Sequence, residues 1–151
     1  AAGKEIGLPE MSINALLALY DEIQESGIFI FEYSAKDTKA VTIRNLLGYG
    51  IFMDTNRMET STEELCVLAH EYGHCITGAT HAVSSPLDLI EKHEYKADKW
   101  AAHKLIDPDK LRQATEGGCT EPWQLAEQFH VTEDFLRRAV YIYQCEGVLP
   151  E

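Results

Sequence analysis

The clearest chemical signal in this sequence is a glutamate between two histidines, His70-Glu71-Tyr72-Gly73-His74. On an α-helix, residues four apart lie about 40° apart around the axis and one turn along it, so both imidazoles can bind one metal ion. Glu71 lies about 100° around the axis from His70, out of line with the ligands but within reach of a water on the metal. Two nitrogen ligands, an activated water and a carboxylate that takes its proton are the components of a metal-assisted hydrolase.

A catalytic zinc site takes three protein ligands and a water, so the two histidines need a third partner. His81 is one candidate, although it lies one position too far along the chain for the extended H-E-x-x-H-x-x-G-x-x-H pattern. The others are carboxylates on a second predicted helix, which can return antiparallel past the first: Glu91, Glu94 and Asp98. Spacing alone does not choose among them. Glu94 and Asp98 are four apart, so one can bind metal while the other orients an imidazole.

Short elements before and after the motif must position these side chains. The motif helix is predicted to begin at Ser61, where Ser61-Thr62-Glu63-Glu64 fits a capping box, and to end at Gly78. The second helix follows over residues 87–106 and ends before Pro108. The remaining patterns predict a leading helix, three short strands and a C-terminal group of two or three short helices, at residues 12–24, 28–31, 41–43, 50–53 and 108–147.

The order of helix, small sheet and further helices, without a repeating βαβ unit, indicates the α+β class. We expect one domain over residues 1–151, with a catalytic core at 1–107 and a helical C-terminal subregion at 108–151. The small sheet is expected to be mostly antiparallel and to pack on the active-site helix. Residues 50–54 are the candidate edge strand, along which an extended substrate adds to the sheet.

Composition narrows the class of function. The chain has 151 residues, with 13 Lys+Arg against 25 Asp+Glu and a formal charge of −12. This acidity argues against broad nucleic-acid binding and against an anionic membrane surface. No apolar run approaches the roughly 18–20 residues of a membrane span, and the N-terminus lacks the pattern of a secretory signal. No two of the four cysteines stand at C-x-x-C spacing, so we predict free thiols in the cytoplasm.

Residues 125–138 resemble a helix-turn-helix in which Thr132 caps the second helix. Five acidic and two basic residues lie between Glu121 and Glu146, and a recognition helix that opens with Glu133-Asp134 would meet phosphates with the wrong sign. We interpret the segment as a packing or partner-docking unit that makes no direct contact with nucleic acid.

Taken with the first motif, Glu94-Tyr95-Lys96-Ala97-Asp98-Lys99-Trp100-Ala101-Ala102 resembles the ImmA/IrrE family of zinc metallopeptidases. The pattern of that family is H-E-x-G-H followed by E-x-x-A-[N/D]-x-[F/W]-A-A-x-L. The resemblance implies a zincin-like fold in which His70, His74 and Glu94 bind Zn²⁺. It also implies that Glu71 is the general base, that Asp98 supports a ligand from outside the ligand set, and that Glu91 is a surface carboxylate.

The resemblance further implies an endopeptidase that cleaves a helix-turn-helix repressor of a mobile element or stress regulon. The departures are small: Asp98 stands where Asn is common, and Ile106-Asp107-Pro108 where a Leu-Met-Pro ending is usual. Two alternatives remain. One is a metal-stabilised module that sequesters such a regulator without cutting it, and the other is a minimal gluzincin peptidase with a different protein substrate. No residue is assigned as the oxyanion stabiliser.

Overall fold

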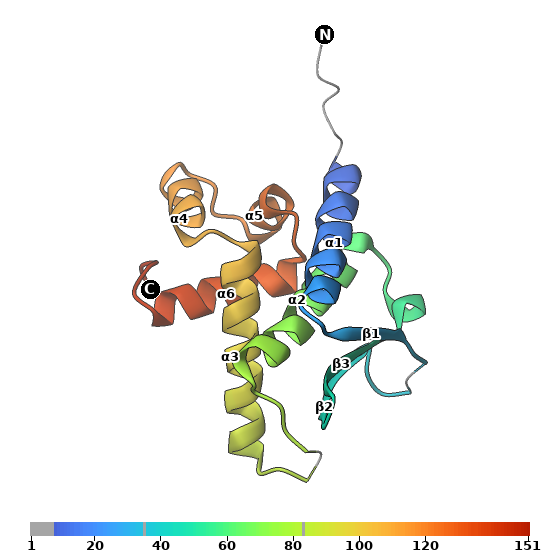
Figure 1. Cartoon of the computed structure of the whole chain (residues 1–151). Coiled ribbons are helices and arrows are strands. Elements are labelled where there is room, and N and C mark those ends of the chain that lie inside the picture. The colour runs from blue at the N-terminus through green and yellow to red at the C-terminus, as the bar shows by residue number, and fades with distance from the viewer. Residues whose placement is uncertain (1–7, 35, 83) are drawn as a thin grey trace.

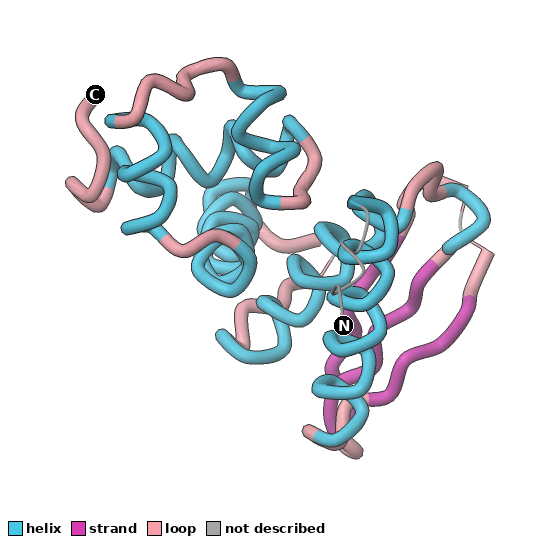
Figure 2. The backbone as a smooth tube through the Cα atoms, turned by 90° about the horizontal axis from the view of Figure 1, so that it is seen from above, coloured by secondary structure: helices cyan, strands magenta, loops and turns pink. Residues whose placement is uncertain are grey.

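A computed structural model describes residues 8–34, 36–82 and 84–151 of the chain. In chain order the elements are α1 (Leu8–Glu25), β1 (Phe29–Glu32), β2 (Ala40–Asn45), β3 (Gly48–Met53), the 3₁₀ helix η1 (Thr55–Arg57), α2 (Ser61–Thr77), α3 (Leu87–Leu105), α4 (Pro108–Glu116), α5 (Pro122–Phe129) and α6 (Glu133–Cys145). The predicted α+β class is confirmed. The sheet and the C-terminal helices lie on opposite sides of the α2–α3 pair (Figure 1), and α1 runs alongside the strands (Figure 2).

The sheet has the strand order β1-β3-β2, with β1 parallel and β2 antiparallel to β3. It is therefore mixed, with one pairing of each kind, where a mostly antiparallel sheet was expected. The prediction that residues 50–54 form an edge is wrong, because β3 is the central strand and pairs on both sides. The tight turn between Asn45 and Gly48 holds β3 against β2, and β1 occupies the other side of β3. The free edges belong to β1 and β2.

Helix α2 begins at Ser61 as predicted, but its cap lies one residue earlier. Thr60 has extended backbone and its hydroxyl accepts a hydrogen bond from Glu63 N at 3.0 Å. The Glu63 carboxylate reaches back to accept from Glu59 N at 2.9 Å. Ser61 already has helical geometry, so the capping role passes to the residue before it. The helix ends at Gly78, whose φ of 66° gives the left-handed conformation that favours glycine.

Helices α2 and α3 approach each other unusually closely at Gly73. A Cβ atom at this position would lie 2.6 Å from the carbonyl oxygen and 3.1 Å from the Cα of Ala97. On α3, Ala97 and Ala101 are fully buried. Helix α2 also packs against α1, β2 and β3, so its motif lies at the centre of the molecule. The small residues between α2 and α3 therefore let the carboxylates of α3 reach the histidines of α2.

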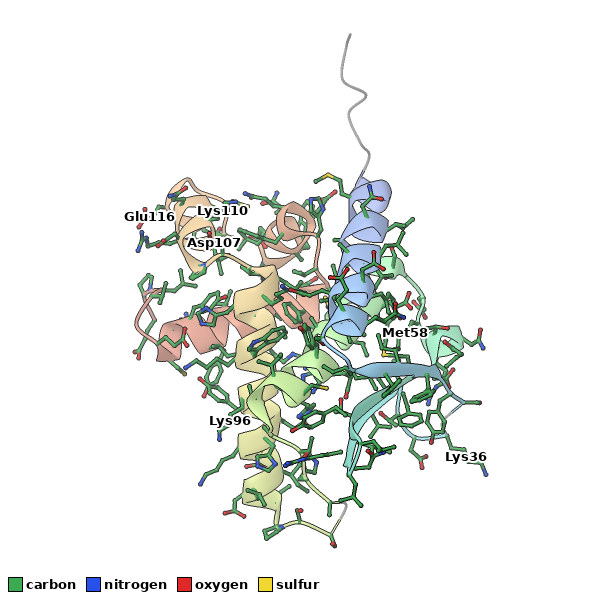
Figure 3. All side chains as sticks on the ribbon, viewed as in Figure 1. Lys36, Met58, Lys96, Asp107, Lys110 and Glu116 are labelled. Atoms are coloured by element: carbon green, nitrogen blue, oxygen red, sulfur yellow. The ribbon has the colours of Figure 1, made fainter. Side chains whose placement is uncertain are left out.

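The C-terminal helices pack on the outer side of this pair. Helix α6 contacts α3 and α5, and the fully buried Tyr143 donates a hydrogen bond to Ile106 O at 2.6 Å. In Figure 3, the labelled side chains of Lys110 and Glu116 mark α4 and that of Lys36 lies at the opposite, sheet side of the molecule. Within the described residues, no helix has both the length and the apolar character needed to cross a membrane.

Candidate metal site

Three side chains from α2 and α3 converge on one point. His70 and His74 lie one turn apart on α2, and Glu94 faces them from α3; one ligand atom of each lies within 4.8 Å of the others. The Glu94 carboxylate is 2.9 Å from His70 Nε2 and 3.1 Å from His74 Nε2, and the two Nε2 atoms are 3.1 Å apart. Two imidazole nitrogens and a carboxylate oxygen form a donor set typical of catalytic zinc. The residues present therefore fit a metal ion.

The other ring nitrogen of each histidine is also held. His70 Nδ1 lies 2.7 Å from Asp98 Oδ1, and His74 Nδ1 lies 2.6 Å from Ala79 O. Both acceptors favour the tautomer that carries its proton on Nδ1, which leaves the Nε2 lone pair for a metal. The carbonyl of Ala79 reaches His74 because the left-handed turn at Gly78 directs the chain back toward α2.

The cluster attracts positive charge. Burial lowers the pKa of His70, but hydrogen bonds to Asp98 and Glu94 outweigh it and raise that pKa to about 10. For His74 burial again lowers the pKa, and the bonds to Glu94 and Ala79 outweigh it, so the net shift is upward. Hydrogen bonds from both histidines hold the pKa of Glu94 well below its ordinary value. The same carboxylates that favour a proton on these histidines would favour a metal cation bound between them.

Glu71 lies on α2 beside the cluster and is only 7% exposed. Thr42, on β2, donates a hydrogen bond from its hydroxyl to Glu71 Oε2 at 2.5 Å, and that hydroxyl is 3.1 Å from Glu71 O. Two hollows of about 400 and 270 Å³ share Glu71 and Glu94 in their walls; the first contains His70 and the second His74. Together they form a cleft that passes over the cluster alongside β2.

The remaining candidate residues lie around this cluster. His81 is outside the ligand group, with its ring 6.3 Å from that of His74, and it lines the smaller hollow. Glu91 lies exposed on α3 and is also outside the group. Arg138, on α6, lies 3.7 Å from Asp98 and lines the larger hollow. The sequence indicated no role for Arg138 or Thr42, because their contacts join positions 29 or more residues apart.

Comparison with known proteins agrees with this geometry. The family model described as an IrrE N-terminal-like domain, of the M78 peptidases, matches residues 23–141, more than three quarters of the chain. The match runs from the end of α1 into α6 and includes every residue of the cluster. Searches of curated proteins and of solved structures give no significant match. The chain therefore belongs to the M78 peptidase family, as the resemblance of its two motifs predicted.

Proposed function

We propose that this protein is a zinc-dependent endopeptidase that cleaves a partner protein. The observation that carries the proposal is the position of Glu71, a buried carboxylate in the same cleft as the donor cluster. A module that only bound metal for stability would have no use for a second carboxylate at this place. Membership of the M78 peptidase family supports the same reaction class.

Zn²⁺ bound by His70, His74 and Glu94 would supply Lewis acidity to the attacking water and to the scissile carbonyl. Glu71 then acts as the general base. Thr42 occupies Oε2, whereas Oε1 has no hydrogen-bond partner among the described residues, so Oε1 takes a proton from the water. The water oxygen bonds to the carbonyl carbon, the C–N bond breaks, and Glu71 returns the proton to the leaving amine nitrogen.

Strand β2 is the edge that we propose for the substrate. Asp54 N donates to Lys39 O at 2.8 Å, which makes positions 39 and 54 a hydrogen-bonded pair. Hydrogen-bonded pairs alternate with non-hydrogen-bonded pairs along an antiparallel ladder, and residues of the second kind direct their main-chain N–H and C=O groups away from the partner strand. Ala40, Thr42 and Arg44 belong to the second kind, so their main-chain groups face away from β3. Ala40 and Thr42 also line the cleft. A substrate segment that adds as a strand beside β2 would therefore lie over the metal cluster.

We propose a helix-turn-helix repressor of a mobile element or stress regulon as the substrate. The resemblance of the two motifs to the ImmA/IrrE family suggests this class, and the charge of −12 complements the basic face of a DNA-binding protein. The four cysteines are free thiols, which supports a cytoplasmic location for the enzyme and its regulator. Binding to the regulator is expected to weaken as salt rises.

The test compares cleavage of the proposed substrate, a helix-turn-helix regulator, by zinc-loaded wild type, Glu71→Gln and Glu91→Gln. Glu91 is the matched control, since it is an exposed carboxylate outside the cluster. Loss of the base is expected to slow cleavage by about 10²–10⁴-fold, whereas Glu91→Gln cleaves like wild type. Equal cleavage by wild type and Glu71→Gln would refute the mechanism. Tight binding of the regulator with no cleavage by any of the three proteins would establish the sequestering module instead.

A further inference from the structure

Thr42 joins two parts of the proposed reaction. Its hydroxyl is 2.5 Å from Glu71 Oε2, and its main chain faces the free edge of β2. We propose that Thr42 is a positioning residue, which orients the Glu71 carboxylate at the same point where the substrate main chain binds. The inference rests on the proposed function and adds a residue to it that belongs to neither sequence motif.

The hydrogen bond from Thr42 can fix the orientation of the Glu71 carboxylate. The last torsion of a glutamate side chain is broad, so packing alone sets the plane of the carboxylate poorly. The Thr42 hydroxyl has one proton, and its nearest acceptor is Oε2, with the backbone oxygen of Glu71 farther away at 3.1 Å. Among the residues that the structure describes, no other hydrogen bond reaches this carboxylate. Thr42 therefore decides which oxygen of Glu71 is left for the water.

The alternation of the strand makes Thr42 the residue of β2 that can do this. Side chains of a strand point alternately to its two faces, so Val41 and Ile43 point to the face opposite Thr42. Ile43 is 48% exposed on that outer face. Ala40 shares the inner face but has no polar side-chain atom. A shift of β2 by one residue would thus place an aliphatic side chain against the base.

The test uses the full chain with bound zinc and three substitutions. Thr42→Val keeps the shape and removes the hydroxyl, and Thr42→Ser keeps the hydroxyl. Thr115→Val is the control, since Thr115 donates to Arg112 O at 2.8 Å on α4, outside the cleft. Cleavage of the proposed helix-turn-helix substrate gives kcat and KM, and competition with a chromogenic chelator gives the Zn²⁺ affinity. Thermal unfolding checks that each variant folds.

Thr42→Val is expected to lower kcat by about 10–100-fold, the usual cost of losing a group that orients a reacting residue. Its Zn²⁺ affinity stays near that of wild type, because Thr42 has no hydrogen bond to the three proposed ligands. KM stays within about threefold, because the main chain of β2 is unchanged. Thr42→Ser recovers most of the rate, and Thr115→Val matches wild type.

Two results would overturn the role of Thr42 while leaving the peptidase intact. One is a wild-type kcat in Thr42→Val, and the other is a Thr42→Ser variant as slow as Thr42→Val, which would mean that the methyl group matters and not the hydroxyl. By contrast, an inactive wild type with zinc bound would refute the proposed function itself, and the role of Thr42 with it.

Discussion

Replacing Gly73 by alanine tests whether the close approach of α2 and α3 is what assembles the metal cluster. The added Cβ would lie 2.6 Å from Ala97 O, whereas ordinary contact begins at 3.4 Å, so the helices must separate by about 0.8 Å. The atoms in the way belong to the backbone of α3 and cannot rotate aside. Glu94 is on α3 and its histidine partners are on α2, so the separation directly lengthens the distances between the three proposed ligands.

Metal ligands tolerate deviations of only about 0.2 Å, so this displacement should weaken Zn²⁺ binding by about 10–100-fold. Peptidase activity should fall by at least a similar factor, since a misplacement of about 1 Å costs roughly 10²-fold. Stability changes less. Alanine gains about 1 kcal/mol over glycine in a helix, and overpacking costs about 1–3 kcal/mol. The melting temperature should therefore fall by no more than about 8 °C.

Zn²⁺ affinity is measured by chelator competition, and thermal unfolding is followed by circular dichroism. Gly117→Ala is the control, because Gly117 ends α4 with a right-handed φ of −74°, away from the cluster, and its added Cβ would be only slightly crowded, at 3.2 Å from Gln113 O. The control should bind Zn²⁺ like wild type. If a folded Gly73→Ala protein binds Zn²⁺ as tightly as wild type, the close approach is not what positions Glu94.

Three further predictions concern the surroundings of the cluster. Asp98→Ala should weaken Zn²⁺ binding by about 10–100-fold, whereas Asp98→Asn, which keeps an oxygen for His70 Nδ1, should lose much less; chelator competition measures both. Against the effect of burial, hydrogen bonds raise the pKa of His70 to about 10, so protonated His70 stabilises the metal-free fold. This contribution is complete below about pH 6.5 and declines as pH rises toward 10, so the melting temperature of the metal-free protein should fall across that range. Glu94→Gln should flatten this dependence; an unchanged slope would contradict the pairing. Burial raises the pKa of the Cys66 thiol, so alkylation of the native protein should modify exposed Cys145 first, as peptide mass spectrometry can show.

The parts of the fold that were predicted correctly are those that local physics determines. The period of apolar residues identified α2 and α3, and Gly78 ended α2 because its left-handed backbone favours glycine. The order of the strands, by contrast, depends on contacts between residues far apart in the sequence. The β2–β3 hairpin follows from a short turn, but only the pairing of β1 with the far side of β3 makes β3 central. No periodicity within residues 50–54 distinguishes an edge strand from a central one in so small a sheet.

The candidate site also contains residues that local spacing predicts and residues that only the tertiary fold brings together. His70 and His74 are one turn apart on one helix, so the sequence places them together without any tertiary information. The choice of Glu94 over its neighbours needed either a family resemblance or the packing of α2 on α3. Gly73 carried a usable signal, since glycine inside a helix costs stability and indicates close packing. Thr42 carried none, because a threonine in a strand is ordinary and only the fold brings it to Glu71.

The helix-turn-helix-like unit illustrates how the fold can change the meaning of a local pattern. Thr132 caps α6 by accepting from Phe135 N at 3.2 Å, as the pattern predicted. In DNA-binding proteins of this type, the first residues of the second helix contact base edges. Here Thr132, Asp134 and Arg138 instead line the hollow that contains His70 and Glu71. A regulator bound along β2 would therefore meet α6 as the opposite wall of the cleft. This supports the proposal that the unit serves a protein substrate, and that the enzyme reaches DNA only through the regulator it cuts.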